Sequence, residues 1–141
     1  MEKREFLKKS VILASSAAVI PTFVLSCKEV KENKSVETLR TRLRTAHIGV
    51  GNMGAEDLRD ISSHTHVDVI ALCDVDTNYL NAAKKTHPNA ATYNDYRIML
   101  KEIGNDIDAV IVSTPDHTHA PASLLAMNMG KHVYCQKPLT H

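Results

Sequence analysis

Short apolar runs alternate with amphipathic segments over most of the chain, and this pattern predicts both strands and helices. The strands are expected over residues 45–50, 67–73, 90–93, 107–114 and 131–135. The helices are expected around residues 58–62, 78–88, 94–104 and 120–130. The second strand is almost wholly apolar in its second half, which is typical of a strand covered on both faces. Strands that alternate with helices build a parallel sheet between two helical layers, so the sequence predicts a doubly wound α/β fold.

Turn and cap residues stand near the expected helix ends. Pro88 stops the second helix, and Asn94 is placed to cap the third, with Gly104 just beyond its end. The fourth helix has Pro121 in its expected first turn and Gly130 at its C-terminus, which is the usual asymmetry.

The first 27 residues have a different pattern. A basic head is followed by an uncharged run over residues 11–26, which Pro21 interrupts. This run is shorter than the roughly 20 apolar residues that a bilayer-spanning helix needs. A basic head and a short apolar run are instead the layout of an export signal. We therefore expect residues 1–27 to direct the protein to the periplasm or cell envelope.

Two short motifs refine this expectation. The stretch KREFLK resembles the twin-arginine export motif, although Lys3 replaces the first arginine. Four positions fit that motif: Arg4, Phe6, Leu7 and Lys8. The stretch VLSC resembles a lipoprotein cleavage box, in which Cys27 would carry the lipid and attach the protein to a membrane. An uncleaved anchor, or a plain secretory signal with an incidental cysteine, is the alternative.

Composition bounds the rest of the chain. Residues 28–44 are charged without an apolar period and are expected to be a linker, so that the folded domain occupies residues 45–141. The 141 residues suit one domain, and 17 Lys and Arg against 16 Asp and Glu give no basic surface for nucleic acid. The three cysteines are too far apart for a zinc spacing or a disulfide framework.

A glycine-rich turn, GVGNMG, follows the first strand and precedes a helix, and it matches the dinucleotide-binding pattern G-x-G-x-x-G. Gly49 would make the tight turn, Gly51 would let the backbone approach a pyrophosphate, and Gly54 would let the helix pack on the strand. Asn52 and Met53 lie at the helix start, where free N–H groups attract phosphates. The turn therefore predicts a dinucleotide site.

Asp74 ends the second strand, twenty residues after Gly54. An acidic residue at this position accepts hydrogen bonds from the adenosine ribose and repels the 2′-phosphate of NADP. No arginine follows it in CDVDTN, so the sequence favours NAD over NADP. A generic strand–helix turn with a solvated aspartate is the alternative.

Polar residues follow the fourth and fifth strands, at the edge where ligands of doubly wound sheets bind. In TPDHTH we expect Thr114 and Pro115 to border the cofactor and His119 to contact its nicotinamide side, whereas His117 is the weaker candidate. A metal site would need further ligands, and none is spaced for it. In YCQKP, the proline restricts Lys137 to extended geometry. This lysine is either a proton shuttle and hydrogen-bond donor or an ordinary surface residue.

Taken in order, GVGNMG, ALCDVD, TPDHTHA and GKHVYCQKPLTH resemble the glucose–fructose oxidoreductase/inositol dehydrogenase (Gfo/Idh/MocA) family over residues 45–141. The family's usual Glu-Lys-Pro is Gln136-Lys137-Pro138 here. The resemblance implies a Rossmann domain that is cut off before its last strand and before a C-terminal substrate domain. It also implies NAD(P)-dependent oxidation of sugars or polyols, with Lys137 both as the catalytic residue and as a residue that positions the cofactor.

This resemblance leaves three functions open. The chain is expected to be the NAD-binding part of an exported oxidoreductase for a sugar-like alcohol, inactive by itself. An NAD-dependent glycosidase of the same family, or a binding-only fragment without turnover, are the alternatives. We expect the full-length protein to be a homo-oligomer.

Overall fold

The computed structural model of the chain describes residues 42–139. The export signal expected at residues 1–27, with the lipid-bearing Cys27, and most of the expected linker at residues 28–44 lie outside the described residues. Between residues 42 and 139, no helix combines the length and the apolar character that crossing a membrane requires.

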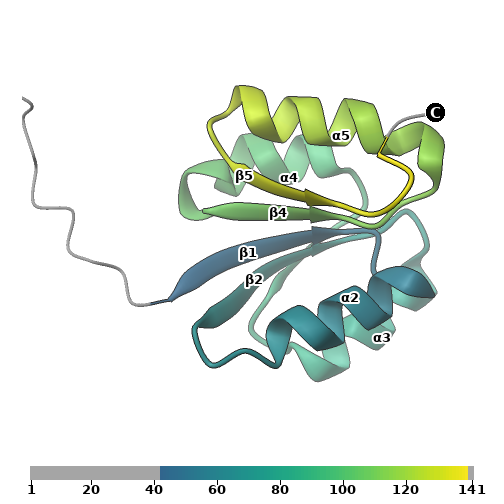
Figure 1. Cartoon of the computed structure of the whole chain (residues 1–141). Coiled ribbons are helices and arrows are strands. Elements are labelled where there is room, and N and C mark those ends of the chain that lie inside the picture. The colour runs from purple at the N-terminus through teal and green to yellow at the C-terminus, as the bar shows by residue number, and fades with distance from the viewer. Residues whose placement is uncertain (1–41, 140–141) are drawn as a thin grey trace, which may run out of the picture. The chain divides into compact units, whose positions relative to one another are not determined.

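One parallel sheet forms the centre of the described domain (Figure 1). Its five strands lie in the order β3-β2-β1-β4-β5, which is the order of the first five strands of a Rossmann fold. The strands are β1 (Leu43–Ile48), β2 (Val67–Cys73), β3 (Ala91–Tyr93), β4 (Ala109–Val112) and β5 (His132–Cys135). Because all neighbouring strands are parallel, their carboxyl ends meet at one edge of the sheet.

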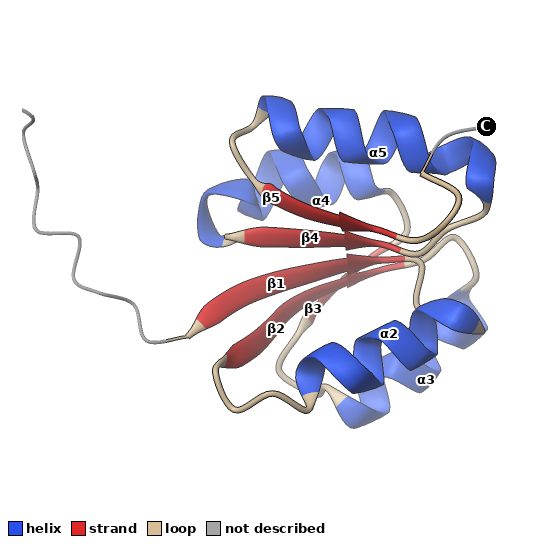
Figure 2. Cartoon of the chain, in the orientation of Figure 1, coloured by secondary structure: helices blue, strands red, loops and turns tan. Residues whose placement is uncertain are grey.

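Helices cover both faces of this sheet (Figure 2). Helices α2 and α3 lie on one face, and α4 and α5 lie on the other. Their bounds are α2 (Met53–Ser62), α3 (Thr77–Thr86), α4 (Tyr96–Ile103) and α5 (Asp116–Asn128), with the short 3-10 helix η1 (Gly104–Asp106) after α4. The predicted doubly wound α/β fold is therefore confirmed.

The core has two parts, one on each side of the sheet. Strand β2 contributes Ala71 and Cys73 to the part that contains α4 and α5, and Leu72 to the part that contains α2 and α3. All three side chains are at most 3% exposed. The apolar run in β2 therefore arises because both faces of this strand are buried, as predicted.

Several helix ends differ from the expectation. The side chain of Asp95, not of Asn94, caps α4 by accepting a hydrogen bond from the backbone N–H of Arg97 at 2.8 Å. The Asn94 amide instead donates to the backbone oxygen of Asp74 at 2.9 Å. Helix α5 begins at Asp116, so Pro121 lies inside the helix and not in its first turn.

Strand β1 begins at Leu43, two residues before the predicted start. Backbone pairing with β2 starts there, and ion pairs that the sequence pattern did not reveal lie at the same end of the strand. Arg44 donates its backbone N–H and its guanidinium to the carboxylate of Asp108, and Arg42 pairs with Asp68. Charged side chains thus join the start of β1 to both neighbouring strands.

Candidate nucleotide-binding site

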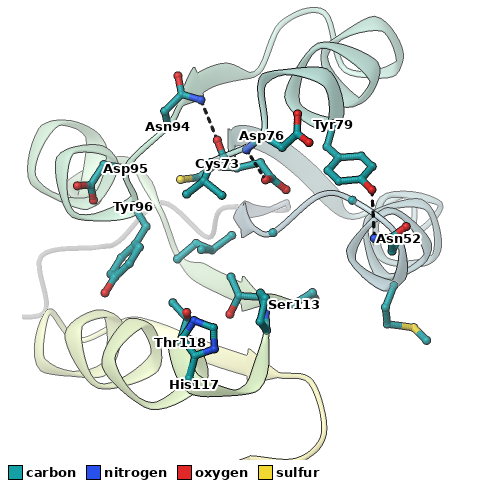
Figure 3. Close-up of a pocket in the computed structure, with 18 of the residues that line it drawn as sticks. Asn52, Cys73, Asp76, Tyr79, Asn94, Asp95, Tyr96, Ser113, His117 and Thr118 are labelled. Atoms are coloured by element: carbon teal, nitrogen blue, oxygen red, sulfur yellow. Dashed lines mark hydrogen bonds between the residues drawn. The ribbon is translucent and has the colours of Figure 1, made fainter.

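A cavity of about 670 Å³ opens at the carboxyl ends of the strands. The turn after β1, the end of β2, the start of α4 and the start of α5 form its walls. Figure 3 shows Asn52 and Tyr79 on one side of this cavity and His117 and Thr118 on another. Seven of the predicted cofactor-binding residues line it: Gly49, Gly51, Asn52, Met53, Asp74, Thr114 and Pro115.

The glycine turn has the geometry that its sequence predicts. Gly49 has φ +83°, and a Cβ there would lie 2.6 Å from the backbone oxygen of Ser113. Gly54 is buried behind the cavity, where a Cβ would lie only 2.2 Å from the backbone oxygen of Gly49. A Cβ on Gly51 would meet the ring of Tyr79 at 2.5 Å. The three glycines thus add no side chain of their own to the turn where a pyrophosphate would approach, and the ring of Tyr79 lies against Gly51.

The start of α2 is open to an anion. Asn52 occupies the N-cap position with φ 47°, and its side chain makes no capping hydrogen bond. Its amide points instead to the hydroxyl oxygen of Tyr79, to which it donates at 3.3 Å (Figure 3). The partial positive charge of the helix start is thus not offset by a capping side chain, which suits a phosphate group.

Asp74 is fixed by the backbone around it. One carboxylate oxygen accepts the N–H of Val50 at 2.8 Å, and the other accepts the N–H of Asp76 at 2.9 Å. These bonds hold the end of β2 against the glycine turn. Since an ionised carboxylate has about four acceptor positions, about two remain for ribose hydroxyls.

Sequence reasoning missed the residues that follow β3. Asn94, Asp95, Tyr96 and Arg97 all line the cavity. The Arg97 guanidinium lies 4.5 Å from the centre of the Tyr96 ring and 3.4 Å from an Asp95 oxygen. The rule that was applied to residues after β4 and β5 could have found this group, because β3 ends at the same edge of the sheet.

The two histidines of TPDHTH lie in different environments. His117 is exposed and lines the cavity. His119 is 1% exposed, and its two ring nitrogens lie 2.7 Å from the backbone oxygens of Thr114 and Pro138. Both ring nitrogens of His119 thus have backbone partners in this structure, and its contact with the nicotinamide side stays a prediction. His119 links the loop after β4 to the Lys-Pro segment.

Lys137 follows β5 at the same edge of the sheet. It is exposed and does not belong to the cavity lining, and its backbone N–H is bound by the side-chain oxygen of Gln136 at 2.9 Å. The peptide bond from Lys137 to Pro138 is cis. The catalytic role that the resemblance implies for this lysine stays a prediction.

Cys73 lines the cavity as well, but its environment opposes thiolate chemistry. Burial raises the pKa of its thiol to about 12, and the negative charges of Asp74 and Asp95 act in the same direction. The thiol is neutral at physiological pH and serves as a small core side chain. Within residues 42–139, no three His, Cys, Asp or Glu side chains are grouped so that they could hold a metal ion.

Known proteins share this fold and part of this sequence. Inositol 2-dehydrogenase from Salmonella typhimurium is 31% identical over 99 residues, which are 69% of this chain and 29% of that protein. Alpha-N-acetylgalactosaminidase from Shewanella oneidensis is 34% identical over 104 residues, which cover 69% of this chain and 23% of that protein. The chain thus spans less than a third of the length of these relatives.

Crystal structures of inositol dehydrogenases also match this chain, again over part of their length. The crystal structure of myo-inositol 2-dehydrogenase from Lactobacillus plantarum matches with a TM-score of 0.65 and 34% identity, over 70% of this chain and 29% of that chain. Scyllo-inositol dehydrogenase from Lactobacillus casei, crystallised with NAD(H) and scyllo-inositol, matches with a TM-score of 0.65 and 28% identity, again over 70% and 29% of the two chains.

A family model described as an oxidoreductase family with an NAD-binding Rossmann fold matches residues 43–141. The match covers the described domain and contains the glycine turn, Asp74 and the Lys-Pro segment. The cavity, its bare glycine backbone and the fixed carboxylate of Asp74 fit the nucleotide that this description names. On this match, the chain belongs to the Gfo/Idh/MocA family of oxidoreductases and has its NAD-binding Rossmann fold.

Proposed function

We propose that this chain is the NAD-binding part of an oxidoreductase that acts on a sugar-like alcohol or polyol. One observation carries the proposal: the glycine turn and Asp74 form one wall of a cavity that His117 and Thr118 border from α5. When bound there, NAD supplies a carbon that accepts or donates hydride. Two inositol dehydrogenases are among the relatives, which supports a polyhydroxylated ring as the substrate class.

The chain's own residues would then have separate tasks. The amides at the start of α2 would hold the pyrophosphate, and Asp74 would accept hydrogen bonds from the adenosine ribose. Lys137, at the end of β5, would bind or deprotonate the reacting hydroxyl. Its ammonium is not held by an ion pair in the part of the chain that the structure describes. It is therefore available to a ligand.

The native protein, purified from its host, should reduce NAD when a suitable polyol is added. The test mixes the purified protein with NAD and a panel of inositols and aldoses, and follows the absorbance of NADH. Formation of NADH with at least one of these substrates supports the proposal. If the protein binds NAD but forms no NADH with any polyol or sugar of the panel, the proposal is wrong.

An NAD-dependent glycosidase is the second candidate, because the relative from Shewanella oneidensis is an alpha-N-acetylgalactosaminidase with slightly higher identity. In such a reaction, hydride removal from one ring carbon would acidify its neighbour, and loss of a proton from that neighbour would expel the leaving group. Water would then add across the double bond, and the hydride would return to the first carbon. An aryl alpha-N-acetylgalactosaminide separates the two candidates. Release of the aryl alcohol without net formation of NADH would favour the glycosidase.

Replacing Asp74 by alanine should weaken NAD binding and remove the preference for NAD over NADP. The variant loses the acceptor for the ribose hydroxyls and the charge that repels a 2′-phosphate. We expect the dissociation constant of NAD to rise by roughly tenfold, as for the loss of about one charge-assisted hydrogen bond. Titration calorimetry with both nucleotides measures this. Asp60→Ala is the matched control, because that exposed carboxylate on α2 lies outside the cavity lining and its loss should leave NAD affinity unchanged.

Equal affinity of the unmodified protein for NAD and NADP would contradict this prediction. Arg97 is the one arginine in the cavity lining of the described chain that could receive a 2′-phosphate. It lies against Tyr96 and Asp95, so a nucleotide phosphate would have to compete with a carboxylate that is already present.

Export is a further part of this proposal and rests on residues 1–27 alone. The basic head, the short apolar run and Cys27 are the supporting features. We expect cell fractionation to find the protein in the envelope. Incorporation of a fatty-acid analogue that is lost on Cys27→Ala would distinguish a lipoprotein from a plainly secreted protein. An unprocessed cytoplasmic form would contradict export.

A further inference from the structure

A polar cluster connects three elements that are far apart in sequence. Asp57 in α2 accepts the hydroxyl of Ser113 at 2.6 Å and the side-chain amide of Gln136 at 3.1 Å. Ser113 directly follows β4, and Gln136 directly follows β5. All three residues are partly buried. A carboxylate that receives two donors in such a place has a defined orientation.

Gln136 uses both ends of its amide. Its nitrogen donates to Asp57, and its oxygen accepts the backbone N–H of Lys137 at 2.9 Å. Its own backbone N–H donates to the oxygen of Val112 at 2.9 Å, which continues the pairing of β5 with β4. The side chain and the backbone of Gln136 are thus both held by the sheet and by α2.

The chemistry of Asp57 determines which way this amide faces. An ionised carboxylate only accepts hydrogen bonds, so the amide nitrogen must face Asp57 and the amide oxygen must face Lys137. A glutamate side chain in place of Gln136 could accept from Lys137 but could not donate to Asp57 while ionised. The carboxylates of Asp57 and of the introduced glutamate would then lie about one hydrogen-bond length apart, and their repulsion strongly disfavours the state in which both are charged.

We propose that Gln136 is a positioning residue for Lys137 and that Asp57 is the acceptor that fixes it. Asp57 lies in α2, and Gln136 directly precedes Lys137 in the chain. The proposal rests on the proposed function for the role of Lys137 in turnover. The fixed geometry of the Lys137 backbone is a separate consequence that can be measured without a substrate.

The test compares Gln136→Glu with a double variant, Asp57→Asn with Gln136→Glu, in the full-length protein. The double variant exchanges the amide and the carboxylate between positions 57 and 136. The new amide nitrogen at position 57 can donate to the new carboxylate at position 136, and the amide oxygen at position 57 can accept the hydroxyl of Ser113. Every hydrogen bond of the cluster is then restored. Asp57→Asn alone should change little, because the Ser113 hydroxyl can also accept. Glu56→Gln is the matched control, since it makes the same chemical change on the exposed side of α2.

The first readout is hydrogen exchange of the Lys137 backbone amide, measured by NMR. Exchange should become roughly tenfold faster in Gln136→Glu, and the double variant should return it to near the unmodified rate. The second readout is turnover of a polyol that the NADH assay described under the proposed function identifies as a substrate. There kcat should fall about tenfold or more in Gln136→Glu with a much smaller change in KM, and the double variant should recover it.

Faster exchange that the added Asp57→Asn change does not reverse, or an unchanged exchange rate in Gln136→Glu, would overturn the proposal. If Gln136→Glu does not fold, Gln136→Met removes both hydrogen bonds without adding charge and should show the same faster exchange. Absence of turnover in the unmodified protein would overturn the proposed function only, because the exchange measurement needs no substrate.

Discussion

Replacing Gly54 by alanine should abolish NAD binding and lower the free energy of unfolding by roughly 3 kcal/mol or more. The Cβ of the alanine would lie 2.2 Å from the backbone oxygen of Gly49. Since that oxygen belongs to the turn itself, no side-chain rotation can relieve the contact. The start of α2 must move away from β1, and the amides that would hold the pyrophosphate move with it.

Urea unfolding and titration calorimetry measure the two effects. Gly130→Ala is the control, because Gly130 also has a positive φ of 73° but has no atom within 4 Å of the position where a Cβ would stand. It should cost only about 1 to 2 kcal/mol of backbone strain and leave NAD affinity unchanged. A Gly54→Ala variant with NAD affinity near that of the unmodified protein would show that the turn does not bind the pyrophosphate.

The domain should lose roughly 3 kcal/mol of stability between about pH 6.5 and pH 4 through His47. This side chain lies in β1, is 1% exposed, and has Thr45 Oγ1 at 3.3 Å from Nε2. Its Nδ1 has no hydrogen-bond partner among the residues that the structure describes. Burial lowers its pKa from 6.5 to about 4, and nearby His87 acts in the same direction, while the charge of Asp57 opposes them.

A depressed pKa means that the folded domain holds this histidine neutral. Below pH 6.5 the unfolded chain takes up a proton that the folded domain does not, so stability falls as the pH falls, until the folded form is also protonated near pH 4. The stabilisation is fully present above pH 6.5. Urea unfolding at several pH values measures the slope, and His47→Val should flatten it. Equal slopes for the two proteins would contradict this assignment.

The sequence could predict the sheet because its strands are short apolar runs with turn residues between them. Strand β2 was predicted with its observed bounds, since both of its faces are buried and the apolar run ends at Asp74. The cap of α4 was less predictable, because Asn94 and Asp95 are both good caps. A tertiary hydrogen bond from Asn94 to the backbone of Asp74 decides between them.

The parts of the site that are formed by neighbouring residues in the sequence were predictable. The parts that depend on how a residue is oriented around its helix axis, or on contacts between residues far apart in the sequence, were not. His117 and His119 are two residues apart in α5, which places them roughly 200° apart around the helix axis. One therefore faces the cavity and the other faces the interior, and H-x-H spacing does not say which. The contact between Asp57 and Gln136 joins residues 79 positions apart, and no local pattern marks it.

The hydrogen bonds that hold Asp74 have a consequence for the kinetics of nucleotide binding. Because the N–H groups of Val50 and Asp76 fix this carboxylate before any ligand arrives, little side-chain entropy remains to be lost when a ribose docks. Association should then be governed by diffusion and orientation, and not by a rearrangement of this residue. Nucleotides of equal charge that differ only at the ribose should therefore bind at similar rates, and the difference in their affinities should lie in how fast they dissociate.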